Sequence, residues 1–147
     1  MTYNKLGFAF TGLRTTSFAK IEAAYKKTGE TDLITALGFG LDIDDYTITC
    51  NTKFSFERKK DQPFLILEIQ ALFEINKSDF LNKVKQKDNS YLIVHDLAVH
   101  FAVLTVGAAR GVLHAKTEGT IYNQFLLPTI DVKELIPEDI ILKPDDV

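Results

Sequence analysis

Histidine and aspartate side chains that could bind a metal ion or transfer protons are clustered in one stretch of the chain. His95 and His100 are five residues apart, and on a helix this spacing turns them about 140° from each other, so they cannot bind the same ion. Asp96 and His100 are four residues apart and can face each other. They supply only two ligands, whereas zinc sites use three or four protein ligands. The spacing favours a structural hydrogen bond between Asp96 and His100, with a metal or small-molecule site as the less favoured alternative.

Cys50 is the only cysteine, so the chain cannot form an internal disulfide. It falls on the apolar side of an alternating segment, and a buried thiol has a raised pKa and is a poor nucleophile. The sequence has no phosphate-binding loop, no dinucleotide-binding glycine motif and no hydrolase nucleophile elbow. The acids at positions 42, 44 and 45 are better explained by a turn than by a calcium site. We therefore expect no cofactor, no metal site and no enzymatic activity.

Composition and charge are those of one globular domain. The 147 residues suit a single domain covering 1–147, with 46% hydrophobic and 25% charged residues. The net charge of −3 disfavours nucleic acid or an anionic membrane as partner, because phosphate binding needs a clustered basic surface. The one dense basic run, at 58–60, is typical of a solvated turn. The first residues show no signal-peptide pattern, so we expect a cytoplasmic protein.

Alternating apolar and polar residues predict four strands, at roughly 6–11, 37–43, 47–57 and 64–75. The third strand is apolar on one face only, which is typical of a strand with its other face in water. The fourth strand is wholly apolar on one face and half apolar on the other, where Phe64, Ile66 and Glu68 lie. Such a strand is expected to touch something on both sides.

A period of 3.6 residues predicts helices in the second half of the chain. The longest runs from Tyr91 to about Lys116, with its N-terminal cap at 88–90, and a shorter one follows a cap at 78–79 as far as about Lys85. A further short helix is expected within 18–28.

The long apolar helix is predicted to be a core helix and not a membrane span. Asp96 and Arg110 would each cost about 2.5–3.5 kcal/mol near the middle of a span. Strands followed by helices indicate the α+β class. We expect a four-stranded antiparallel sheet packed with one long helix and short flanking helices.

These elements carry more apolar surface than one chain can bury. The surplus could form a subunit interface in a homo-oligomer, or a groove that binds unfolded or extended polypeptide, or both. Two classes of function therefore stay open: a polypeptide-binding chaperone, and a structural or adaptor oligomer with one dedicated partner.

Several segments occur in an order that is similar to one known family. They are Phe8-Ala-Phe10 with Ser17-Phe18, Tyr46-Thr-Ile-Thr49, residues 64–70 with 73–75, and Ala109-Arg110-Gly111 followed by Leu127-Pro128-Thr-Ile-Asp131-Val-Lys-Glu-Leu135. Together they cover roughly residues 6–136 and resemble the SecB-type export chaperones and their SecB-like relatives. Those proteins have a four-stranded antiparallel sheet, a long helix, a loop and a second helix.

The resemblance implies a holdase, which is a chaperone that keeps client chains unfolded without ATP and has no catalytic residues. It implies a tetramer built as a dimer of dimers. Carried over by position, Ile66 and Glu68 match the patch that docks the export motor SecA. The client-binding residues implied by the resemblance are Phe8, Phe10, Phe18, Ile130, Val132, Leu135 and Ile136.

The sequence departs from the family in two places. Asp131 stands where the family usually has asparagine, and only twelve residues follow Leu135, with prolines at 137 and 144. The second helix and the motor-binding tail are therefore expected to be short or missing. A dedicated chaperone of a toxin–antitoxin system fits these departures as well as a general export chaperone does.

Overall fold

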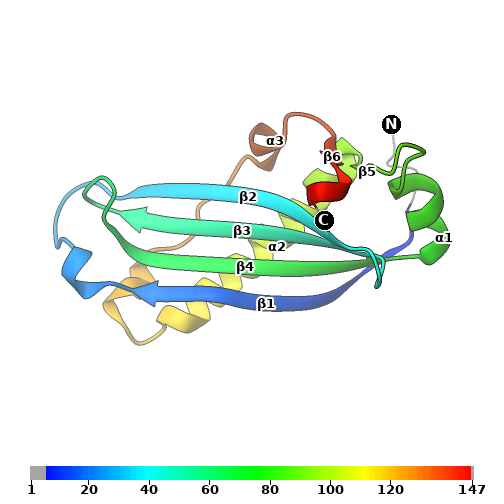
Figure 1. The fold of residues 1–147 in the computed structure, drawn as a ribbon. Helices are drawn as coiled ribbons and strands as arrows, with labels where there is room; N and C mark the ends of the chain where they lie inside the picture. The colour runs from blue at the N-terminus through cyan, green and yellow to red at the C-terminus, as the bar shows by residue number, and fades with distance from the viewer. Residues whose placement is uncertain (1–5, 147) are drawn as a thin grey trace.

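The computed structural model describes residues 6–146 and has two layers, a sheet and the helical chain that crosses one face of it (Figure 1). The main sheet has four antiparallel strands in the order β1-β4-β3-β2. Its strands are β1 (Phe8–Lys20), β2 (Asp32–Asp42), β3 (Thr47–Glu57) and β4 (Pro63–Ile75). The predicted fold class is confirmed: an α+β arrangement of this sheet with one long helix and short flanking elements.

The remaining elements follow the sheet in sequence. They are α1 (Lys77–Asp79), which continues into a π-helical turn (Phe80–Val84), β5 (Tyr91–Ile93), α2 (His95–Thr117), α3 (Val132–Leu135) and β6 (Ile140–Leu142). Short 3-10 turns lie at Glu22–Ala24, Ile121–Gln124 and Pro144–Asp146. Strands β5 and β6 pair with each other as a separate two-stranded antiparallel sheet, here called the ribbon.

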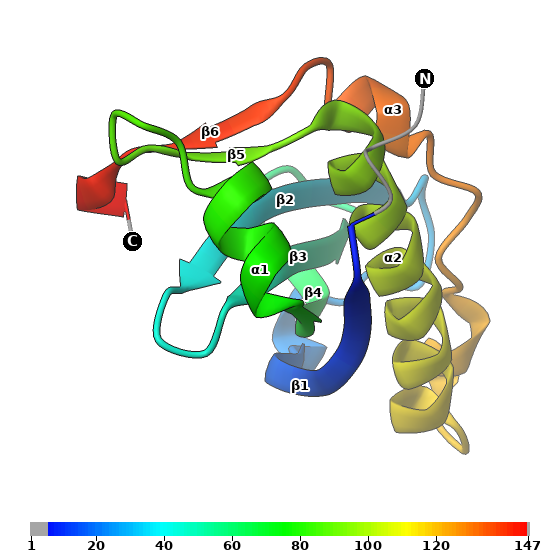
Figure 2. The ribbon, with the colours of Figure 1, turned by 90° about the vertical axis from the view of Figure 1, so that its right-hand side faces the viewer.

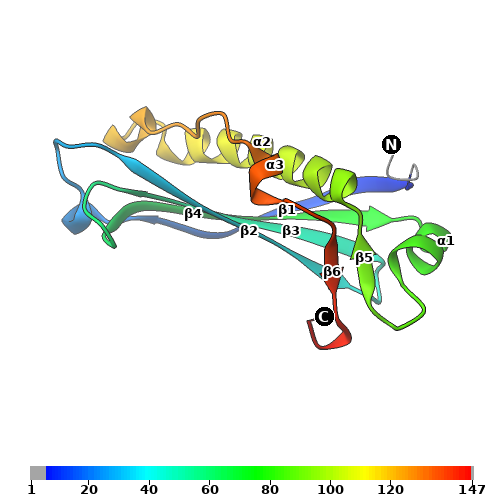
Figure 3. The same ribbon diagram turned by 90° about the horizontal axis from the view of Figure 1, so that it is seen from above.

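The core lies between α2 and one face of the sheet (Figure 3). The predicted apolar faces of β3 and β4 are buried there, and the ring of Phe73 stacks on that of Phe101 at 4.1 Å between centroids. The contact stripe of α2 repeats every four residues through Phe101, Thr105, Ala109 and Leu113. This i, i+4 row faces the sheet, so Ala109 and Leu113 are buried.

Helix α2 is long and apolar enough to cross a membrane by length and composition alone. Half of its most apolar window is buried against the rest of the chain, however. Since the buried half faces the sheet and the turn after α2, α2 is a core helix, as predicted.

The short helix predicted within 18–28 is reduced to the 3-10 turn at Glu22–Ala24. Strand β1 continues as far as Lys20, and the amide of Ile21 still donates to the carbonyl of Phe64 at 2.8 Å. Pairing with β4 is therefore favoured over the helix, whose sequence pattern is weak and is soon ended by Gly29.

Phe64 was predicted to lie on the outer face of β4 and is instead fully buried. The pairing of β3 with β4 shifts by one residue at the turn before Phe64, and this shift turns its side chain inward.

The predicted start of the long helix is also wrong, because residues 91–93 form β5. Helix α2 begins at His95, and its cap comes from the other end of the chain: the amide of His95 donates to Asp139 Oδ1 at 2.6 Å. Helix α1 is capped by Asn76, whose Oδ1 accepts from the amides of Ser78 and Asp79. Asp79, expected in the cap, accepts a hydrogen bond from Gly7, and this bond lowers its pKa.

An extended segment, residues 125–131, returns along α2 from its C-terminal end toward α3, and is here called the strap (Figure 3). Arg110 on α2 holds it: Nε donates to the carbonyl of Leu127 at 3.0 Å and Nη2 to that of Pro128 at 2.8 Å. Farther along, the ring of His95 hydrogen-bonds the carbonyl of Ile136 at 2.7 Å. An extended segment has no internal partners for its carbonyls, so these side chains complete its hydrogen bonding.

The thiol of Cys50 should be unreactive in the native protein. Burial raises its pKa to about 11, and a hydrogen bond with Thr105 offsets only part of that rise. At mildly alkaline pH the thiolate is therefore scarce as well as inaccessible. We expect no labelling by a disulfide reagent until guanidinium chloride is added; stoichiometric labelling of the folded protein would contradict this.

Removing the two bonds that Arg110 donates should loosen the strap. Arg110→Met keeps the aliphatic stem, so we expect the free energy of unfolding in urea to fall by about 1–3 kcal/mol and the strap amides to exchange faster with deuterated solvent. Lys60→Met, in an exposed turn, is the matched control and should change neither. Equal exchange in both variants would show that Arg110 does not anchor the strap.

Candidate functional site

The three aromatic residues of β1 lie along one margin of α2. Phe8 is half-buried and packs edge-on against Phe101, with centroids 4.9 Å apart. Phe10 is 41% exposed, although its ring lies 4.9 Å from that of Phe73. Phe18 lies farther along the strand, where the ammonium group of Lys116 sits 5.4 Å from its ring. Of the three, Phe10 presents the most open apolar surface.

A groove runs between the outward side of α2 and the strap. Its volume is about 530 Å³, and its walls include Val103 and Val106 from α2, Leu126 and Ile130 from the strap, and Val132. Val103 is 52% exposed and Leu126 57% exposed, so the groove presents large aliphatic side chains to solvent. Such open apolar surface in a concave site is suited to binding apolar side chains of another chain.

The last two expected client-binding residues lie beyond the groove. Leu135 is 40% exposed at a hollow of about 600 Å³ that extends as far as Ile141. Ile136 is only 1% exposed, so its side chain belongs to the core. Val132 is likewise buried and forms part of the groove floor. The expected set therefore divides into exposed residues and residues that support them.

Helix α2 lies between β1 and the strap, as Figure 2 shows. The structure thus brings Phe8 and Phe10 together on one side of α2, and Ile130 and Val132 on the other. It does not join the seven expected residues into one continuous site within a single chain. The two groups form separate apolar surfaces along the same helix.

The outer face of the sheet carries Ile66 and Glu68. Glu68 lies 3.8 Å from the ammonium group of Lys53, and Ile66 is half-buried. Beside them a polar row crosses three strands: Gln70 donates to Asn51 at 3.0 Å and accepts from Arg14 at 3.4 Å. This face carries charges of both signs, and α2 and the strap lie on the opposite face of the sheet (Figure 3).

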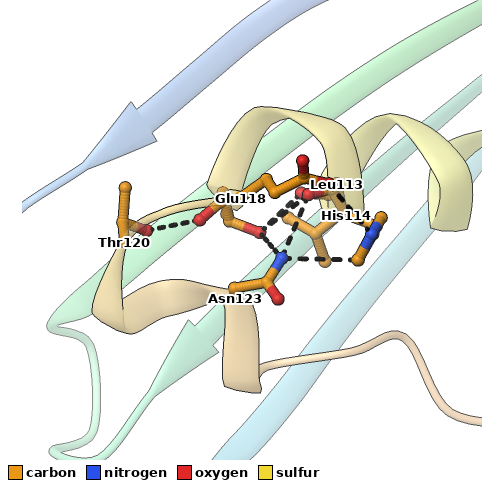
Figure 4. Close-up of polar contacts among 6 residues, drawn as sticks. Leu113, His114, Glu118, Thr120 and Asn123 are labelled. Carbon is orange, nitrogen blue, oxygen red and sulfur yellow. Dashed lines mark hydrogen bonds and ion pairs between the residues drawn. The ribbon is translucent and has the colours of Figure 1, made fainter.

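The polar groups at the C-terminal end of α2 form a closed hydrogen-bond network (Figure 4). The side-chain nitrogen Nδ2 of Asn123 donates to the His114 carbonyl and to Thr117 Oγ1, each at 3.1 Å. His114 Nε2 lies 3.3 Å from Glu118 Oε2. These bonds fold the 3-10 turn back against the helix end and satisfy carbonyls that a helix terminus leaves free. The network explains the local turn and needs no ligand.

The candidate metal or catalytic groups do not converge. Asp96 Oδ1 lies 3.5 Å from His95 Nδ1, and the ring of His100 packs edge-on against Phe8 at 5.7 Å. Within residues 6–146, no cluster of three or more histidine, cysteine, aspartate or glutamate side chains could hold a metal ion. The open apolar surfaces on the two sides of α2 are the candidate site that the described residues offer.

Sequence reasoning missed several residues of these surfaces. Val103 and Leu126 fall between the residues of the predicted patterns, and their exposure depends on how α2 rotates and where the strap runs. The role of Arg110 as anchor of the strap was also missed. One signal was present: an arginine in an otherwise apolar helix has to find hydrogen-bond acceptors.

Comparison with known proteins gives a match in structure but none in sequence. No family model and no curated protein matches the chain. Among solved structures, it is similar to the Mycobacterium tuberculosis Rv1957 SecB-like chaperone in complex with a ChAD peptide from the Rv1956 HigA1 antitoxin. The TM-score is 0.54 and the identity 12%, over 84% of this chain and 90% of that chain. The resemblance seen in the sequence is thus confirmed for the fold: this chain has the fold of a SecB-like chaperone.

Proposed function

We propose that this protein is an ATP-independent holdase that binds unfolded or extended polypeptide. The observation that carries the proposal is the pair of open apolar surfaces along α2 in a SecB-like fold, with Phe10 on one side and Val103 and Leu126 on the other. An unfolded chain aggregates through exposed apolar side chains, and these surfaces can cover them. Binding of this kind acts by mass action on the unfolded state and needs neither nucleotide nor catalytic groups.

The partner of the similar structure supports the same reading. Rv1957 was solved with a peptide of an antitoxin bound. We infer that this chain also takes extended peptide segments, and that a dedicated partner, such as an antitoxin, is the second candidate beside a broad set of clients. We place this activity in the cytoplasm.

An export role would require SecA to dock on the outer face around Ile66 and Glu68. Glu68 is within reach of Lys53, which reduces the negative charge that this patch can offer. After α3 the chain forms β6 of the ribbon, and the described residues contain no long second helix of the kind that SecB-type chaperones have. These features support a chaperone without a SecA step more than an export chaperone.

Within the proposed site, the exposed residues contact the client and the buried ones shape the surface. Phe10, Ile130 and Leu135 supply contacts, together with Phe8 and Phe18 at the margin of β1. Val132 and Ile136 support them from below. We also propose that the chain self-associates, as a dimer or a dimer of dimers, because two apolar surfaces and an uncovered sheet face exceed what a monomer usually exposes.

The holdase proposal is tested by aggregation of a chemically unfolded client diluted into buffer. Wild-type protein at near-stoichiometric ratio should suppress light scattering without ATP. Phe10→Ser and Val103→Ser each remove exposed apolar surface, so each should weaken suppression several-fold, since burying such a side chain contributes about 1.5–3 kcal/mol.

Lys59→Ser is the control, because Lys59 is exposed in the turn between β3 and β4 and lines none of the proposed surfaces. It should suppress aggregation as well as the wild type does. If the wild type fails with several unrelated clients, the general holdase is excluded and the dedicated-partner or adaptor role takes its place.

Self-association is tested by light scattering coupled to size exclusion. At micromolar concentration we expect a mass that is a multiple of the 16.6 kDa chain. A single species at the monomer mass over the whole concentration range would rule out the oligomer.

A further inference from the structure

The free edge of β2 is unusually regular for an edge strand. All eleven residues, Asp32–Asp42, pair with β3 without a register shift, whereas β1 at the opposite edge has two shifts. Charged residues occur only at the ends of β2, and it contains no proline. Edge strands are normally protected from pairing with other chains by charges, prolines or bulges. The β1 edge has such protection and the β2 edge does not.

The hydrogen-bond pattern shows which backbone groups face this edge. The amide of Ile75 donates to the carbonyl of Tyr46, so Tyr46 and Ile75 form a hydrogen-bonded pair. The pair Ile48–Phe73 lies two residues farther along both strands and is therefore of the same kind. The even-numbered residues of β3 thus hydrogen-bond to β4. Backbone groups alternate along an antiparallel pair, so odd-numbered residues of β3 bond β2. They stand opposite even-numbered residues of β2, as Lys53 stands opposite Ala36. The amides and carbonyls facing outward are therefore those of Leu33, Thr35, Leu37, Phe39 and Leu41.

The open part of the edge is the half nearer Asp32. In Figures 1, 2 and 3 the ribbon lies beside the edge of β2 near the C-terminal end of that strand, so it leaves the other half of the edge open. Among the described residues, no backbone hydrogen bond between chain segments reaches the outer edge of β2. Leu33, Thr35 and Leu37 thus present a short row of backbone donors and acceptors, with their side chains directed toward the apolar α2 side.

Charge and shape select the occupant of this edge. A second copy, paired antiparallel, would bring its own ribbon and would place the Asp32 end of one chain beside the acidic Asp42 end of the other. Asp32 also stands directly opposite Glu57, and like charges in that position repel. A basic residue at the end of an incoming strand would relieve this repulsion. The edge therefore fits a short extended peptide with alternating apolar residues and a basic end.

We propose that an extended client segment adds to the main sheet as a fifth strand, antiparallel to β2, and bonds the backbone of Leu33, Thr35 and Leu37. This inference rests on the proposed function and gives it a defined binding site and register. One face of the added strand extends the apolar surface on the α2 side, and the other extends the outer face. Recognition through the backbone tolerates many sequences, as a chaperone requires.

The first test changes only the ligand. The probe is the fluorescently labelled peptide Lys-Lys-Val-Thr-Val-Thr-Val-Thr-Val-Lys-Lys, measured by anisotropy. In an antiparallel pair, two residues that hydrogen-bond to each other point their side chains to the same face. The valine side chains should therefore face α2, and the valine backbone groups should hydrogen-bond to β2. Methylating the valine amides should weaken binding about tenfold or more, while methylating the threonine amides should have little effect. Glutamates in place of the lysines should also weaken binding.

The second test changes only the edge. Thr35→Pro removes an outward amide and leaves the ladder to β3 intact, a position where an edge strand tolerates proline. It should abolish peptide binding, whereas Thr35→Ala should bind as the wild type does. Leu13→Pro, whose amide faces outward on β1, is the matched control at the other edge and should also retain binding. Circular dichroism checks that each variant is folded, and the methylation series decides the matter if Thr35→Pro is not.

The outcomes separate this inference from the proposed function. If the wild type binds the peptide and suppresses aggregation, but methylation at either set of amides has no effect, strand addition is wrong and the holdase stands. If only threonine methylation weakens binding, the antiparallel register is wrong. If the wild type neither binds the peptide nor suppresses aggregation, the holdase proposal fails, and this inference fails with it.

Discussion

The stacking of Phe101 on Phe73 joins α2 to the sheet, and the arrangement of every apolar surface depends on that contact. The rings lie 4.1 Å apart and nearly parallel, with alanines and Thr105 continuing the contact stripe along the helix. Small residues let the helix axis approach the sheet closely. Since one helix cannot cover four strands, apolar residues at both margins, such as Phe10 and Leu37, keep part of their surface open. The open surfaces therefore follow from having a single covering helix.

A few long-range polar contacts then determine where the rest of the chain lies. Arg110 binds two carbonyls of the strap, and Asp139 caps the helix from a site 44 residues away in sequence. Without these contacts the strap would leave backbone carbonyls unpaired next to an apolar helix. They also mean that the wall of the groove is held by side chains and not by a strand ladder. Segments held in this way open more readily than core strands do, which would suit the proposed binding of clients of different size.

The sequence predicted the regular parts of the fold well and the long-range parts poorly. The alternation in β3 and β4 identified both strands and their buried faces, because every second residue of a half-buried strand faces the core and is apolar. β5 was mistaken for the start of α2, since its partner β6 is about fifty residues away and leaves no local pattern. The same limit applies to the site. The resemblance pointed to segments that the structure places along α2, but whether Val132 and Ile136 are buried or Leu135 is exposed depends on packing that no local pattern encodes.

The two edges of the sheet differ in a way that bears on how the proposed holdase would both assemble and bind clients. A protein that self-associates and also binds extended chains needs surfaces that do not compete. β1 is bulged and flanked by exposed aromatic and aliphatic side chains, so contacts there depend on side-chain packing and can be specific to one partner. β2 offers a regular row of backbone groups with few large side chains on its outer face, where Ala36, Gly38 and Gly40 alternate with the residues that face α2. Backbone pairing is insensitive to sequence, whereas side-chain packing is not. Under the proposed function, the selective contact would therefore use one edge and the permissive contact the other, so that a single sheet would serve both.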